Sequence, residues 1–178
     1  MKNTKKPNKI FFRKGFTMLE MIIYMAMLGV ISILITHSFM AMTKSFGAVK
    51  LSRDVNESAL MVMERISREI RSAYDINTDD SVFGSSPGRL SLISLNDMGA
   101  TTTIKLYMQG ADIYVEKEGL SPEPLTSSST LATGLTFSRI IASSTSEAVK
   151  LEFEIAGSAG PVSRTDKFYN TIILRGSY

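Results

Sequence analysis

Residues 16–42 read FTMLEMIIYMAMLGVISILITHSFMAM, a run in which Glu20 is the one formally charged side chain. An α-helix rises about 1.5 Å per residue, so about 20 apolar residues span the hydrocarbon core of a bilayer, which is about 30 Å thick. Residues 21–42 are long enough for this. The run therefore predicts a single membrane-spanning helix near the N-terminus.

Basic side chains precede the apolar run. Residues 1–15 carry six of the 20 basic residues and no acidic one, which leaves 14 basic and 17 acidic residues in the rest of the chain. The positive-inside rule then predicts a cytoplasmic N-terminus and an extracytoplasmic C-terminal part. The uneven charge also removes the electrostatic basis for nucleic-acid binding, because the basic pI comes from this leader alone. The leader charges are Lys2, Lys5, Lys6, Lys9, Arg13 and Lys14.

A secretory signal peptide is the first alternative for this N-terminus. Its apolar region normally has about 7–15 residues and is followed by a small-x-small cleavage site. Here the apolar run is longer, and only the weak Ser45-Phe46-Gly47 follows it. Both observations favour a helix that stays on the protein.

The junction between the two parts reads Lys14-Gly15-Phe16-Thr17-Met18-Leu19-Glu20 and resembles the class III signal of type IV prepilins and pseudopilins. The resemblance implies that a membrane aspartyl prepilin peptidase cuts after Gly15 and N-methylates Phe16. It further implies that Glu20 binds the N-terminal amine of a neighbouring subunit during filament assembly. Met18 stands where Leu is common in the family. The proline that kinks many pilin helices is missing, since no proline lies between Pro7 and Pro87.

The position of Glu20 also has a physical cost. A carboxylate costs about 2.5–3.5 kcal/mol at the centre of a membrane helix and less near its end. It either reaches the headgroups or meets a positive partner inside an assembly. An amine on one subunit and Glu20 on the next would attract strongly in a low-dielectric bundle, and this pairing would set the stagger between subunits.

Residues 43–75 predict that the helix continues beyond the membrane, so that one helix runs from Thr17 to Tyr74. Its charged face includes Glu69 and an i,i+4 pair, Glu64–Arg68. We expect the apolar stripe to pack on the chain's own sheet, and a coiled-coil partner is the alternative. The stripe, widened by Val62, consists of Val55, Ala59, Met63, Ile66, Ile70 and Ala73.

The remainder, residues 76–178, predicts an antiparallel β domain. Loop-forming residues fill Asp75–Gly88, and a Ser/Thr/Pro-rich loop fills Glu118–Thr133. Alternation of apolar and polar residues is clearest around Val149, Leu151, Phe153 and Ile155. The fold class is thus α+β, a long N-terminal helix packed on an antiparallel β-sheet. The strand-like runs are Arg89–Asn96, Thr101–Met108, Ala111–Lys117, Leu135–Ile141, Ala148–Ala156 and Lys167–Arg175.

Few routes to catalysis remain, because the chain has no cysteine and one histidine, His37. Asp75-x-Asn77-x-Asp79 matches the start of an EF-hand loop, but the later turn glycine and the bidentate glutamate are missing. The segment Gly84–Arg89 lacks the lysine of a phosphate loop. We therefore expect no enzyme, metal or cofactor.

The predicted role is that of a structural filament subunit held in the cytoplasmic membrane by one helix, with an extracytoplasmic C-terminal domain. Its expected partners are prepilin peptidase, other pilin or pseudopilin subunits and the membrane, without nucleic acid. A minor pilin or pseudopilin of a type IV pilus, type II secretion or competence filament is favoured over a major pilin. The alternative from another class is an uncleaved bitopic protein with an external binding domain.

Overall fold

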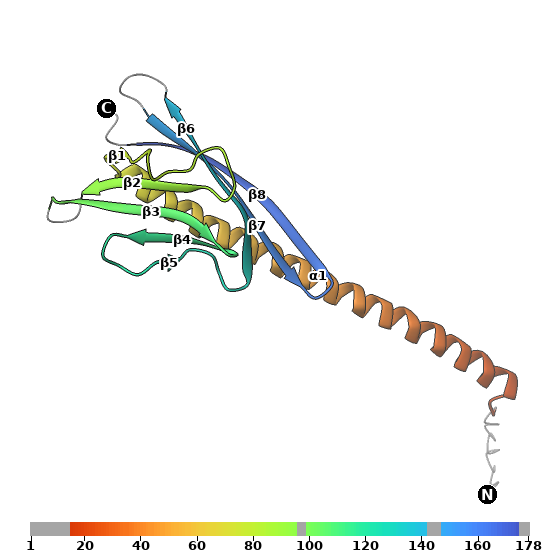
Figure 1. Cartoon of the computed structure of the whole chain (residues 1–178). Coiled ribbons are helices and arrows are strands. Elements are labelled where there is room, and N and C mark those ends of the chain that lie inside the picture. Colours follow the sequence, from red (N-terminus) through yellow and green to blue (C-terminus); the bar gives the residue numbers. More distant parts are fainter. Residues whose placement is uncertain (1–14, 96–98, 142–146, 175–178) are drawn as a thin grey trace, which may run out of the picture. The chain divides into compact units, whose positions relative to one another are not determined.

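The computed structural model describes residues 15–95, 99–141 and 147–174. One helix, α1 (Met18–Ser72), is followed by antiparallel strands, which confirms the α+β class (Figure 1). The helix starts and ends within two residues of the prediction. Contacts divide the chain into two compact units, and the second begins at Lys44. The strands are β1 (Asp75–Ile76), β2 (Arg89–Leu95), β3 (Thr101–Gln109), β4 (Asp112–Lys117), β5 (Glu123–Pro124), β6 (Thr130–Ile141), β7 (Glu147–Ala159) and β8 (Val162–Ile173).

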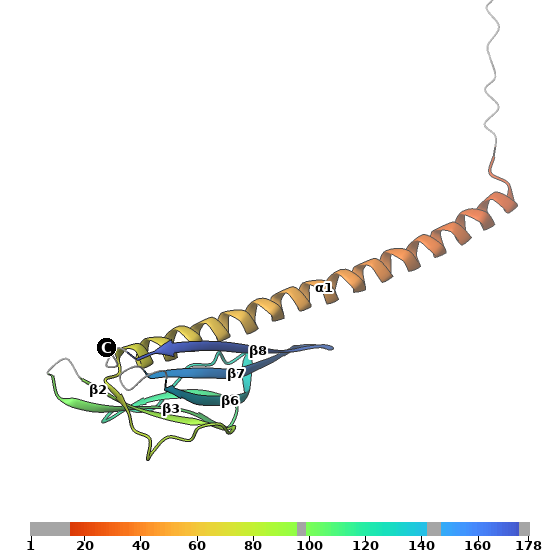
Figure 2. The ribbon, with the colours of Figure 1, turned by 90° about the horizontal axis from the view of Figure 1, so that it is seen from above.

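The part of α1 in the second unit buries one face in the core of that unit. Figure 2 shows it on one side of the strands. Spacing of three or four residues keeps the buried side chains on one face of a helix. Strands of the same chain cover the predicted stripe, so a coiled-coil partner is not what buries it. The apolar helix residues in this core are Leu51, Val55, Ala59, Val62, Ile66, Ile70 and Ala73, while Met63 is only partly buried.

Glu69 does not lie on the exposed charged face of α1, where the sequence placed it. Its side chain is buried at 4% exposure. The Glu69 Oε1 atom lies 3.1 Å from Arg65 Nε and 3.2 Å from Lys117 Nζ, and these two cations offset the cost of burying the carboxylate. In the described part of the chain, the helix ion pair is therefore Arg65–Glu69 and not the predicted Glu64–Arg68.

The strands form two sheets where a single sheet was predicted. One has the order β1-β2-β3-β4-β5 and the other β6-β7-β8, and all neighbouring strands are antiparallel. Two-residue loops join β3 to β4 and β7 to β8. The first loop residues, Gly110 and Gly160, have φ of 64° and 60°. This left-handed conformation favours glycine and is what a tight hairpin turn requires.

The strand β6 begins inside the segment predicted to be a loop. Thr130 is buried, and its hydroxyl donates to Ser58 Oγ of α1 at 2.9 Å. Ser58 Oγ also accepts a hydrogen bond from the backbone N–H of Ser127 at 3.3 Å. The serine- and threonine-rich composition thus builds a buried polar contact with the helix. The segment before Thr130 is mostly exposed, as predicted for a loop.

Backbone hydrogen bonds join the two sheets along the outer edge of β6. The N–H groups of Gly84 and Gly88 donate to the carbonyls of Phe137 (2.9 Å) and Leu135 (2.7 Å). The N–H of Ala132 donates to the carbonyl of Ala111 at 2.7 Å. The segment Gly84–Arg89, compared above with a phosphate loop, therefore covers a strand edge.

At Gly157 of β7, side chains of α1 pack directly against the backbone of the strand. A Cβ atom at this position would lie 2.7 Å from Leu51 Cδ1 and 3.2 Å from Val55 Cγ2. Real Cβ atoms almost never come so close to another carbon, so glycine allows the helix to lie at this distance.

Candidate functional site

The candidate site lies where α1 begins. Gly15, Phe16 and Thr17 are not helical, and the helix starts at Met18. The backbone N–H of Glu20 donates to Thr17 Oγ1 at 3.2 Å, which makes Thr17 the N-cap residue. The Thr-x-x-Glu spacing is that of a capping box, a local signal that the reading of the sequence overlooked.

The carboxylate of Glu20 has a partner within its own helix. The hydroxyl of Tyr24 donates to Glu20 Oε1 at 2.8 Å. The rings of Phe16 and Tyr24 meet edge to face, with their centroids 6.1 Å apart and their planes at 74°. The structure thus brings together two of the predicted site residues, Phe16 and Glu20, through a third residue that had not been singled out. The i,i+4 spacing of Glu20 and Tyr24 is the signal that could have revealed it.

Gly15 lies next to these residues in exposed, non-helical backbone, and a Cβ there would meet no atom within 4 Å. A protease can bind such a segment without unwinding a helix. The leader charges at Lys2, Lys5, Lys6, Lys9, Arg13 and Lys14 lie outside the described residues.

The part of α1 that belongs to the first unit, up to Thr43, is apolar and exposed. Within the described residues, α1 is long and apolar enough to span a membrane, and none of its most apolar window is buried. A core helix of a soluble protein would be mostly buried, so this helix is consistent with a single-pass membrane protein. A signal sequence would have the same composition.

Polar side chains in this unit bond to the helix backbone. The hydroxyls of Ser32 and Thr36 donate to the carbonyls four residues earlier, at 2.8 and 2.9 Å. Thr43 does the same with Phe39 at 3.1 Å. Hydroxyl groups satisfied in this way are compatible with a lipid environment, where no water is at hand to replace a partner.

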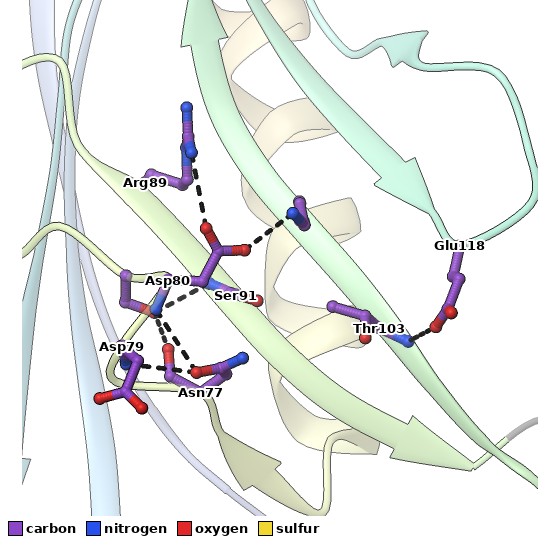
Figure 3. Close-up of polar contacts among 9 residues, drawn as sticks. Asn77, Asp79, Asp80, Arg89, Ser91, Thr103 and Glu118 are labelled. Atoms are coloured by element: carbon purple, nitrogen blue, oxygen red, sulfur yellow. Dashed lines mark hydrogen bonds and ion pairs between the residues drawn. The ribbon is translucent and has the colours of Figure 1, made fainter.

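A second polar cluster lies at the loop after α1 (Figure 3). Asn77 Oδ1 accepts hydrogen bonds from the N–H groups of Asp79 (3.2 Å) and Asp80 (3.4 Å). The Asp80 carboxylate lies 2.8 Å from Lys105 Nζ and 3.6 Å from Arg89 Nη1. The hydrogen bond from Lys105 holds the pKa of Asp80 below its usual value, with a smaller contribution from Arg89.

The acidic residues of the Asp75-x-Asn77-x-Asp79 pattern lie on different elements in the structure. Asp75 belongs to β1 and pairs with Ile93 of β2. Among residues 15–95, 99–141 and 147–174, no three acidic or histidine side chains gather where they could hold a metal ion. The cluster fastens the loop to β2 and β3 instead.

Comparison with known proteins adds no relative: no family model, curated protein or solved structure matches the chain. Sequence and structure together define an α+β protein with one candidate membrane helix and a site at the start of that helix.

Proposed function

We propose that this chain is a type IV pilin-like subunit, a minor pilin or pseudopilin that works by assembling into a filament. The observation that carries the proposal is the sequence Lys14–Glu20 at the start of an exposed apolar helix. In this proposal the role is structural and non-enzymatic, without cofactor, metal or nucleic acid. The filament is a type IV pilus or a secretion or competence filament.

Processing is the first step of the proposed function. Prepilin peptidase cuts the bond between Gly15 and Phe16 and methylates the new amine of Phe16. Exposed, non-helical backbone on both sides of this bond supports the assignment. In this proposal the basic leader, residues 1–15, remains on the cytoplasmic side, and the second unit, which begins at Lys44, lies outside the cytoplasm.

Assembly is the second step. The amine of Phe16 carries a positive charge, and Glu20 of a neighbouring subunit supplies the negative one. Each charge is costly alone in an apolar medium, and their attraction is strong there because little solvent screens it. The pair therefore fixes the position of one helix along the next.

The first test is the intact mass of the protein in membranes of its native host. We expect a chain that begins with N-methylated Phe16. A chain that keeps Lys2–Gly15 in cells with active prepilin peptidase would refute the proposal and favour an uncleaved bitopic membrane protein.

Two substitutions separate processing from assembly. Gly15→Val should leave the precursor uncut, because the side chain crowds the cleavage site. Glu20→Ala should be cut normally but should not enter filaments beside wild-type subunits. Normal filament entry of Glu20→Ala would remove the charge-pairing argument.

A further inference from the structure

The hydroxyl of Tyr24 differs from three other hydroxyls of the first unit in what it binds. Those of Ser32, Thr36 and Thr43 donate to carbonyls of their own helix. Tyr24 donates instead to the carboxylate of Glu20, at 2.8 Å. It is also the single tyrosine in residues 15–43. The one acidic group of the apolar segment thus has a dedicated side-chain donor.

The contact engages one of the two carboxylate oxygens. A carboxylate has two oxygens and can accept several hydrogen bonds. Tyr24 uses Oε1, and Oε2 of Glu20 has no partner among the described residues. A hydrogen bond from a phenol to a carboxylate is charge-assisted and therefore stronger than a neutral one.

Neighbouring residues restrict both ends of this contact. Thr17 caps the backbone N–H of Glu20 at 3.2 Å, which fixes the first helical turn. The ring of Phe16 packs edge to face on the ring of Tyr24, 6.1 Å between centroids. An aromatic pair in this geometry contributes beyond simple burial. The phenol is thus held where it reaches Glu20.

We propose that Tyr24 is a positioning residue for Glu20: it binds one carboxylate oxygen and leaves the other for the cationic amine of a second subunit. This inference rests on the proposed filament function and adds a residue to it. The hydroxyl of Tyr24 stabilises the lone carboxylate in the membrane before assembly and orients it for pairing.

The test uses the full-length protein in its native host, with filament entry measured relative to processed subunit in the membrane. Tyr24→Phe removes the hydroxyl and keeps the ring that contacts Phe16. Hydrogen bonds between side chains in membranes correspond to about 3- to 20-fold in an equilibrium, so we expect filament entry to fall by about that factor. The control Tyr74→Phe removes an equivalent hydroxyl from an exposed tyrosine of the second unit and should have no effect.

A spectroscopic measurement separates this role from simple packing. In lipid vesicles, the infrared carboxylate band of Glu20 is obtained by subtracting the spectrum of Glu20→Ala. Tyr24→Phe should shift this band, because it removes the hydrogen bond to Oε1, and Tyr74→Phe should not. Packing of the ring alone would leave the band in place.

The outcomes distinguish the two proposals. Normal filament entry of Tyr24→Phe, or an unshifted Glu20 band, overturns the role of Tyr24. The proposed function still stands in that case if Glu20→Ala fails to enter filaments. Normal filament entry of Glu20→Ala removes the charge pairing and with it the role of Tyr24, while the filament function itself is tested by the processing at Phe16.

Discussion

The close approach of α1 to β7 at Gly157 makes a quantitative prediction for Gly157→Ala. The added Cβ would lie 2.7 Å from Leu51 Cδ1, whereas carbon atoms in contact normally lie about 3.5–4.0 Å apart. Leu51 is buried at 2% exposure, so it cannot move away without disturbing its neighbours. Overpacking of this kind costs about 1–3 kcal/mol of unfolding free energy.

A matched variant removes the backbone contribution. Replacing glycine by alanine within a strand contributes about 0.5–1 kcal/mol of stability by itself, which partly hides the clash. A Cβ atom added at Gly134 of β6 would meet no atom closer than 3.7 Å, so Gly134→Ala reports the backbone contribution without a clash. The difference between the two variants should therefore be about 1–3 kcal/mol.

The assay is urea unfolding of the full-length protein in detergent micelles, followed by near-ultraviolet circular dichroism of the tyrosines. Gly157→Ala should shift the midpoint to lower urea, and Leu51→Ala should show coupling with it in a double-mutant cycle, because the smaller side chain makes room for the new Cβ. Equal unfolding free energies for Gly157→Ala and Gly134→Ala would refute the close packing of α1 on β7.

Two further predictions use the same unfolding assay. Ser58→Ala should cost about 0.5–1.5 kcal/mol, because it removes the acceptor of the Ser127 N–H and one of the two acceptors of the Thr130 hydroxyl, the other being the Ser127 carbonyl at 3.2 Å. Ser52→Ala removes a hydrogen bond to Arg164 that is exposed to solvent and should change stability by less than about 0.5 kcal/mol. Asp80 has a lowered pKa when folded, so its pairing with Lys105 stabilises the protein above about pH 4 and is lost as the pH falls through the folded pKa. The difference in unfolding free energy between wild type and Lys105→Met should thus become smaller below about pH 4. A difference that stays constant down to about pH 2 would contradict this.

The sequence predicted those features that depend on neighbours along the chain. The alternation around Val149–Ile155 indicated β7, and the spacing of Val55, Ala59, Ile66 and Ile70 indicated the buried face of α1. These patterns repeat every two residues or every three to four, so they can be read without knowing the partner.

Features that depend on distant residues were missed. Glu69 was placed on the exposed face because one of its two cations, Lys117, comes from β4, far along the chain. Thr130 was placed in a loop because its acceptor, Ser58, lies on α1. The division of the strands into two sheets was likewise missed, because strand pairing depends on residues that lie far apart in the sequence.

At the candidate site, by contrast, the local sequence pattern was enough to identify the main residues. Gly15, Phe16 and Glu20 were chosen from their local pattern, and the structure adds how they are held. Tyr24 was overlooked although it lies one turn from Glu20, because it was counted only as part of the apolar run. A polar tip on an otherwise apolar ring has to be considered separately from the ring.

The hydrogen bonds along the outer edge of β6 also determine how the second unit opens. The amides of Gly84 and Gly88, in the loop before β2, donate to carbonyls of β6. The amide of Ala132, in β6, donates to the carbonyl of Ala111 in the turn between β3 and β4. Deuterium replaces these protons when their hydrogen bonds open, either locally or as the two sheets separate. An equal, high free energy of exchange at all three amides would mean that the two sheets unfold as one cooperative unit, whereas unequal values would indicate local opening.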